Sequence, residues 1–88
     1  MTQTQNPELV DVSLLTDIPS VSAHLSLLET AEEECRLAIN TFMQEELAQR
    51  NISHAAAIHE LKQRRTVIEF QRTFLRSRLS RLHDEASL

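Results

Sequence analysis

Beyond Pro19 the chain contains no further proline, it has no glycine anywhere, and its charges are divided along the sequence. Residues 1–46 carry nine acidic side chains and one basic one, whereas residues 47–88 carry eight basic and four acidic ones. A long stretch without these two helix breakers favours long helices. An acidic helix followed by a basic helix is expected to fold back on itself, because antiparallel packing brings opposite charges together.

The length of the chain limits it to one small domain. A chain of 88 residues buries too small a fraction of its surface to be very stable alone, so oligomerisation is expected. The single cysteine, Cys35, excludes an internal disulfide and suits a reducing compartment such as the cytoplasm. The sequence shows neither a secretory signal nor a membrane-spanning run. A net charge of −4 predicts no overall attraction to nucleic acid.

Residues 1–16 differ from the rest and are expected to form a partly disordered N-terminal arm. Asn6 and Pro7 can begin a short helix, as N-cap and first helical residue. However, Val10, Val12 and Leu14 alternate with polar residues, which is typical of a strand. The sequence leaves both alternatives open. The arm either packs on the main body or captures a partner or a second subunit.

Residues 17–84 are expected to form a helical hairpin, followed by a tail at 85–88. Asp17 or Ser20 can cap a first helix over about 19–50. Residues 51–53 form the expected turn, since Asn51 tolerates a left-handed backbone, and a second helix should run over about 53–83. The alternative is one uninterrupted helix, because a tight turn usually contains glycine.

Each expected helix carries an apolar stripe with heptad-like spacing. The fold class is therefore all-α: an antiparallel hairpin of two long helices that assembles into a four-helix bundle or a larger helical oligomer. The residues expected to pack along the stripe of the hairpin are Leu25, Leu28, Cys35, Ile39, Phe42, Leu61, Ile68, Leu75 and Leu79.

One charged residue interrupts each stripe in the middle. Glu32 lies on the first stripe and Arg72 on the second. A turn near Asn51 brings them within about one residue of opposition. We expect the two side chains to pair and to set the register of the hairpin, as buried polar pairs do in coiled coils.

The second helix has an additional apolar face at Val67, Phe70 and Phe74. These residues lie well away from the stripe that faces the first helix. Because a two-helix hairpin cannot bury both faces, we expect a homodimer or a dimer of dimers that uses this face.

Sequence motifs for catalysis or metal binding are missing. His59 and Glu60 resemble the start of a zinc-protease HExxH motif, but Gln63 stands where the second histidine is needed. Cys35 is interpreted as a core residue, and all four histidines, including His24, as surface or rim residues. The sequence therefore predicts no enzyme, no cofactor and no metal site.

The expected function is that of a small regulator or adaptor that binds another protein, for example an inhibitor or antirepressor. An acidic surface around Glu29, Glu33 and Glu45 would meet a basic partner. The first alternative is a secretion-type chaperone whose Phe70 and Phe74 shield an apolar helix of a client. RNA or DNA binding by the arginine-rich half is less favoured, because these arginines scatter around the helix.

Overall fold

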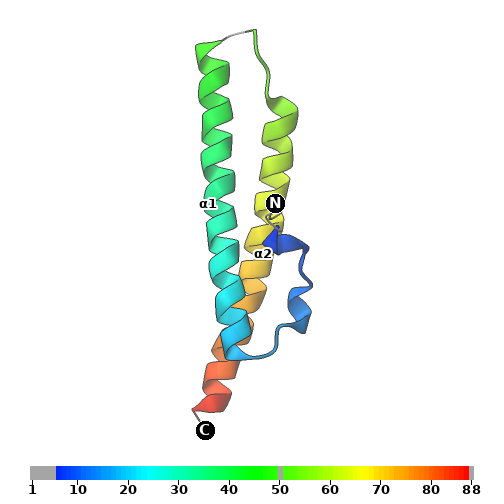
Figure 1. Cartoon of the computed structure of the whole chain (residues 1–88), viewed down its shortest axis with the longest axis vertical. Coiled ribbons are helices and arrows are strands. Elements are labelled where there is room, and N and C mark those ends of the chain that lie inside the picture. Colours follow the sequence, from blue (N-terminus) through cyan, green and yellow to red (C-terminus); the bar gives the residue numbers. More distant parts are fainter. Residues whose placement is uncertain (1–5, 50, 88) are drawn as a thin grey trace, which may run out of the picture.

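The computed structural model describes residues 6–49 and 51–87. All regular secondary structure among these residues is helical. Two short 3₁₀ helices, η1 (Pro7–Leu9) and η2 (Val12–Leu14), precede two long helices, α1 (Ile18–Ala48) and α2 (Ala55–Ala86). The two long helices pack against each other as a hairpin (Figure 1), which confirms the all-α fold class. The alternative of one uninterrupted helix is wrong.

Helix α1 begins where its capping residue allows. The Asp17 carboxylate accepts a hydrogen bond of 3.0 Å from the backbone N–H of Ser20, and Pro19 occupies the first turn. This cap satisfies an amide that no helical carbonyl can reach. It also lowers the pKa of Asp17, because the hydrogen bond from the Ser20 backbone stabilises the charged carboxylate.

The connection between the helices is longer than the expected turn. Helix α1 ends two residues early, at Ala48, and α2 begins at Ala55. A left-handed backbone at Asn51 stays a prediction, because its φ angle involves Arg50. Arg50, expected near the end of the first helix, lies outside the described residues.

The second helix extends further than expected at its C-terminus. Helix α2 continues to Ala86, so residues 85 and 86 of the expected tail at 85–88 are helical. At its N-terminus the backbone N–H of Ala55 donates to Ser53 Oγ at 3.4 Å. His54 precedes the helix, and its backbone N–H donates to Glu46 Oε1 at 2.5 Å across the hairpin.

The core is narrow and lies along the line where α1 and α2 meet. Val21, Leu28, Cys35, Ile68 and Leu75 are completely buried. Leu25 and Ile39 are also buried, whereas Phe42, Leu61 and Leu79 are half-buried at its margins. The ring of Phe42 contacts the ring of His54, with 4.6 Å between centroids.

The described part of the N-terminal arm, residues 6–16, packs on the hairpin. The short helix expected from Asn6 and Pro7 is present as the 3₁₀ helix η1, with Asn6 at the N-cap position. The strand alternative is wrong, since Val12–Leu14 forms η2, which Asp11 caps through Ser13. The arm runs alongside the half of the hairpin that is distant from the connection (Figure 1). Val12 and Leu15 of the arm pack against the core of the hairpin. The expected disorder of residues 1–5 concerns residues outside the described part of the chain.

Candidate interaction surface

A stripe of hydrogen-bond donors on α2 holds the arm in a groove between the two long helices. Arg64, Gln71 and Arg78 are spaced seven residues apart, so they lie in a row on one face of α2. Arg64 Nε donates to Glu8 Oε1 at 2.6 Å, and Gln71 Nε2 donates to the carbonyl oxygen of Glu8 at 2.8 Å. The Glu8 side chain is only 7% exposed, which makes this pair a buried anchor.

The far end of the arm is held through its backbone. Arg78 Nη1 donates to the carbonyl oxygens of Ser13 and Leu15, at 2.8 and 2.9 Å. The same guanidinium lies 4.8 Å from the centre of the Phe74 ring, at cation–π distance. The arm is thus recognised mainly by its main chain, with one side-chain ion pair at Glu8.

Helix α1 contributes the opposite wall of this groove. His24 Nε2 lies 2.9 Å from the carbonyl oxygen of Pro7 and donates to it. His24 is only 7% exposed, so its interpretation as a surface or rim residue is wrong. The sequence has no local signal that His24 is buried, because the segment that covers it, at Pro7, lies 17 residues away in the chain.

The groove is incompletely filled by the arm. A partly open pocket of about 400 Å³ remains between the arm and α1, lined among others by Val10, His24, Leu27 and Ala31. Under the arm, Gln71 Oε1 is buried and has no hydrogen-bond partner among the described residues.

The structure divides the expected apolar face of α2 into two parts. Phe74 is half-buried and packs against the core, where the arm also packs, so the arm accounts for part of the face that was expected to meet a second subunit. Val67 and Phe70 remain 46% and 75% exposed. On α2 they lie on one side of the stripe that holds the arm. Val67 comes three residues after Arg64, and Phe70 directly precedes Gln71.

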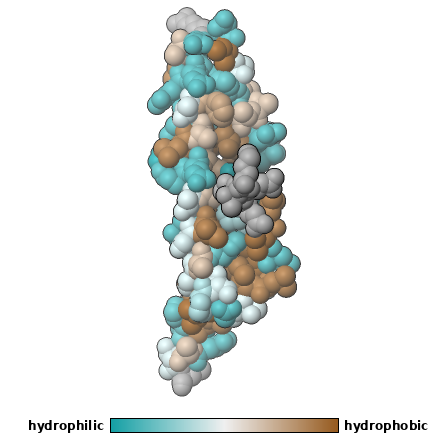
Figure 2. Space-filling model, in the orientation of Figure 1, coloured by the Kyte–Doolittle hydropathy of each residue, from teal (hydrophilic) through white to brown (hydrophobic). Residues whose placement is uncertain are grey.

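The outer side of the arm is also apolar. Leu9 and Leu14 are 79% and 75% exposed, and hydrophobic atoms gather along the side of the molecule where the arm lies (Figure 2). We call Leu9, Leu14, Val67 and Phe70 together the apolar patch.

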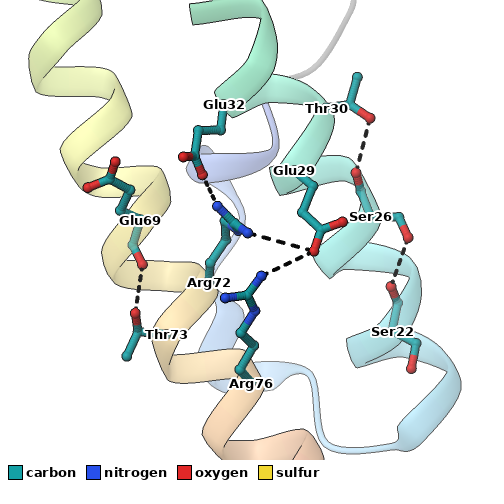
Figure 3. Close-up of polar contacts among 9 residues, drawn as sticks. All are labelled: Ser22, Ser26, Glu29, Thr30, Glu32, Glu69, Arg72, Thr73 and Arg76. Atoms are coloured by element: carbon teal, nitrogen blue, oxygen red, sulfur yellow. Dashed lines mark hydrogen bonds and ion pairs between the residues drawn. The ribbon is translucent and has the colours of Figure 1, made fainter. Parts of the chain in front are cut away.

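The remaining face of the hairpin is ionic. Glu32 and Arg72, the two residues that interrupt the stripes, are brought together, with Arg72 Nη1 donating to Glu32 Oε2. The guanidinium of Arg72 also lies 3.8 Å from Glu29, which Arg76 contacts at 3.5 Å (Figure 3). These side chains join the middle of α1 to the middle of α2 across the edge of the core.

The three residues expected to form an acidic partner surface have partners within the chain. Glu29 pairs with Arg72 and Arg76, and Glu33 pairs with Arg36. Glu45 Oε2 lies 2.8 Å from His54 Nε2. All three side chains are still about half exposed, and the charges of Glu29 and Glu33 are partly neutralised by these arginines.

The basic side chains are used in the same way. Of the eight described lysines and arginines, five form ion pairs with carboxylates and Arg78 binds the arm. Among the described residues this leaves Lys62 and Arg81 without such a contact. Nucleic-acid binding depends on several basic groups directed at phosphates. The arrangement therefore offers little for such a partner.

The described residues contain no group of three or more histidine, cysteine, aspartate or glutamate side chains that could hold a metal ion. Cys35 is fully buried, and burial raises the pKa of its thiol above the ordinary range. None of the described helices has an apolar stretch long enough to span a membrane.

No protein-family model, curated protein or solved structure matches this chain. The interaction surface is therefore described by its own residues. Sequence reasoning missed Glu8, His24, Arg64, Gln71 and Arg78 as the residues that join arm to hairpin. The seven-residue spacing of Arg64, Gln71 and Arg78 could have predicted a separate face of α2 that binds another segment.

Proposed function

We propose that this chain is a small non-enzymatic regulator or adaptor of the cytoplasm that binds another protein and works as a homo-oligomeric helical bundle. The observation that carries the proposal is the apolar patch. It combines two leucines of the arm with Val67 and Phe70 of α2, all of them large side chains left in contact with solvent. Extended apolar patches of this kind mark sites of protein association.

The dimensions of the molecule support self-association. A compact monomer of 10.1 kDa exposes about 5,300 Å². This chain exposes 6,575 Å², and its long axis measures 60 Å against a short axis of 15 Å. Two hairpins that cover the apolar patch of one another would form a four-helix bundle with the arms between them. An inhibitor or antirepressor that sequesters its partner is the class of regulator that this architecture suits.

Sedimentation equilibrium of the wild-type chain and of Phe70→Asp tests the proposal. The wild type should sediment as a dimer or a dimer of dimers, and Phe70→Asp should shift the equilibrium at least about tenfold toward monomer, because a charge replaces the centre of the patch. Leu47→Asp is the matched control. Leu47 is 81% exposed, lies at the C-terminal end of α1 and is not part of the apolar patch.

The partner is identified by affinity purification with each of these variants. A regulator should recover one main protein with wild type and Leu47→Asp and lose it with Phe70→Asp. A wild type that sediments as a folded, dilution-stable monomer would contradict the proposal. Rescue of an unstable chain only by its client would favour the chaperone alternative, and recovery of RNA or DNA would favour the nucleic-acid alternative.

A further inference from the structure

We infer that the groove between α1 and α2 is a binding site for an extended acidic segment of a partner protein, and that the N-terminal arm occupies this groove as an internal competitor. The inference deepens the proposed function, since it names the kind of segment that the module binds. It is argued from the way in which the arm is held, from its charge, and from the space that the arm leaves unused.

The contacts that hold the arm are those of a peptide-binding site. Four carbonyl oxygens of the arm, those of Pro7, Glu8, Ser13 and Leu15, accept hydrogen bonds from hairpin side chains over 2.8–2.9 Å. Every backbone of similar shape presents such carbonyls, whatever its side chains. Recognition through the main chain gives affinity, and a few side-chain positions give selectivity.

Charge selects an acidic occupant. The side chain of Arg64 is only 27% exposed, and its Nε lies 2.6 Å from Glu8 Oε1. The hydrogen bond to Glu8 raises the pKa of Arg64, so the guanidinium stays charged. A half-buried cation of this kind requires a carboxylate partner. The apolar residues of the arm that pack on the core stand four and seven positions later, at Val12 and Leu15. The preferred occupant therefore carries an acidic residue followed by apolar residues at these two spacings.

The arm is an imperfect occupant of the groove. Gln71 Oε1 is buried without a partner among the described residues, although a backbone N–H of a differently placed segment would satisfy it. The pocket of about 400 Å³ beside Val10 and Leu27 gives room for larger side chains than the arm supplies. The arm does have the advantage of its covalent attachment, which gives it a high effective concentration. A partner segment that fills the pocket and pairs with Gln71 can offset this advantage.

Binding of a labelled synthetic peptide of residues 6–16 to the full chain tests the inference. In the wild type the tethered arm competes, so the peptide should bind weakly. In the Glu8→Arg chain the arm is repelled by Arg64 and the groove is free, so the peptide should bind at least about tenfold more tightly. A peptide with Arg in place of Glu8 is the matched control and should not bind that chain. The Arg64→Glu chain should bind neither the acidic peptide nor its own arm.

Equal affinity of the acidic peptide for the wild-type and Glu8→Arg chains, with circular dichroism showing both to be helical, would overturn the inference. If Glu8→Arg does not fold, the wild type is titrated with excess peptide that carries a paramagnetic spin label, which must broaden the side-chain amide signals of Gln71 in the NMR spectrum. Signals that stay unchanged also overturn the inference.

Two further measurements distinguish a different protein from a second copy of this chain, and the groove from the apolar patch. The second copy is tested with Phe70→Asp present in both chains, so that association through the apolar patch is removed. A mixture of Glu8→Arg and Arg64→Glu chains in which heterodimers still form would make the arm of a second copy the occupant, and would overturn the assignment to a different protein. The Phe70→Asp chain should show the same peptide affinity as the wild type, because none of the hydrogen bonds that hold the arm involves Phe70. The experiments therefore distinguish failure of the proposed association through the apolar patch from failure of the proposed peptide binding in the groove.

Discussion

Single side chains decide how the arm of this molecule is placed. Arg78 contributes two hydrogen bonds to arm carbonyls and covers the Phe74 ring. His24, a polar residue on the buried side of α1, is satisfied by the carbonyl of Pro7. Buried polar groups of this kind require a partner, because an unmade hydrogen bond in the interior is costly. The arm thus supplies hydrogen-bond partners for buried polar groups of the groove, which allows these groups to lie beside the small core.

Cys35 provides a test at the same scale. Its side chain is fully buried, and burial raises the pKa of the thiol, so the folded chain carries the neutral, unreactive form at about pH 8. We expect a disulfide reagent such as Ellman's reagent to modify the native chain at least about a hundredfold more slowly than the chain in denaturant. Absorbance of the released thiolate measures both rates. Rapid modification of the native chain would contradict the burial of Cys35.

At the scale of the elements, α2 presents three different faces. One face packs on α1 through Ile68 and Leu75, the next holds the arm, and a third carries Arg72 and Arg76 toward Glu29 and Glu32. This division explains why a single apolar stripe did not account for all the apolar residues of α2. It also places the pair of Glu32 and Arg72 beside the core, where it opposes a shift of α2 along α1.

Removing one member of that pair tests its contribution. Arg72→Ala should lower the free energy of unfolding by about 1–2 kcal/mol, because it leaves a half-buried Glu32 without its partner. Arg76→Ala is the matched control and should cost less than about 0.5 kcal/mol, since its side chain is 58% exposed. Urea unfolding followed by circular dichroism measures both. Equal losses would show that burial does not distinguish the two arginines.

The whole molecule is elongated, and its core is thin. Eight apolar residues are buried along the hairpin, while ten large hydrophobic residues remain exposed among those described. A chain built in this way has little stability to spare.

If association through the apolar patch supplies the missing stability, the melting temperature must depend on chain concentration. We expect it to rise by several degrees when the concentration of the wild-type chain is increased roughly a hundredfold, and to stay constant for Phe70→Asp. Differential scanning calorimetry of both chains at two concentrations gives the answer. A melting temperature of the wild type that is independent of concentration would contradict coupled folding and association.

Local sequence was sufficient for the long helices and for the stripe that joins them. The absence of glycine and proline after Pro19, the Asp17 cap and the spacing of Leu28, Cys35, Ile68 and Leu75 all act over a few residues. Such short-range signals predict an element and its buried side. The ends of the helices near the connection were predicted less well, because no short-range pattern marks Ala48 as the last residue of α1 or Ala55 as the first residue of α2.

The placement of the arm was decided by tertiary structure alone. Asn6, Pro7 and Asp11 favour short turns within residues 6–16, but the position of these turns on the hairpin is fixed by donors that stand 63 or more residues away in α2. The sequence therefore determined the hairpin, its charge division and its apolar stripes, because these follow from local preference and periodicity. Only the folded hairpin creates the groove, and the groove determines which side of the arm is buried and which of Val67, Phe70 and Phe74 remain exposed to solvent.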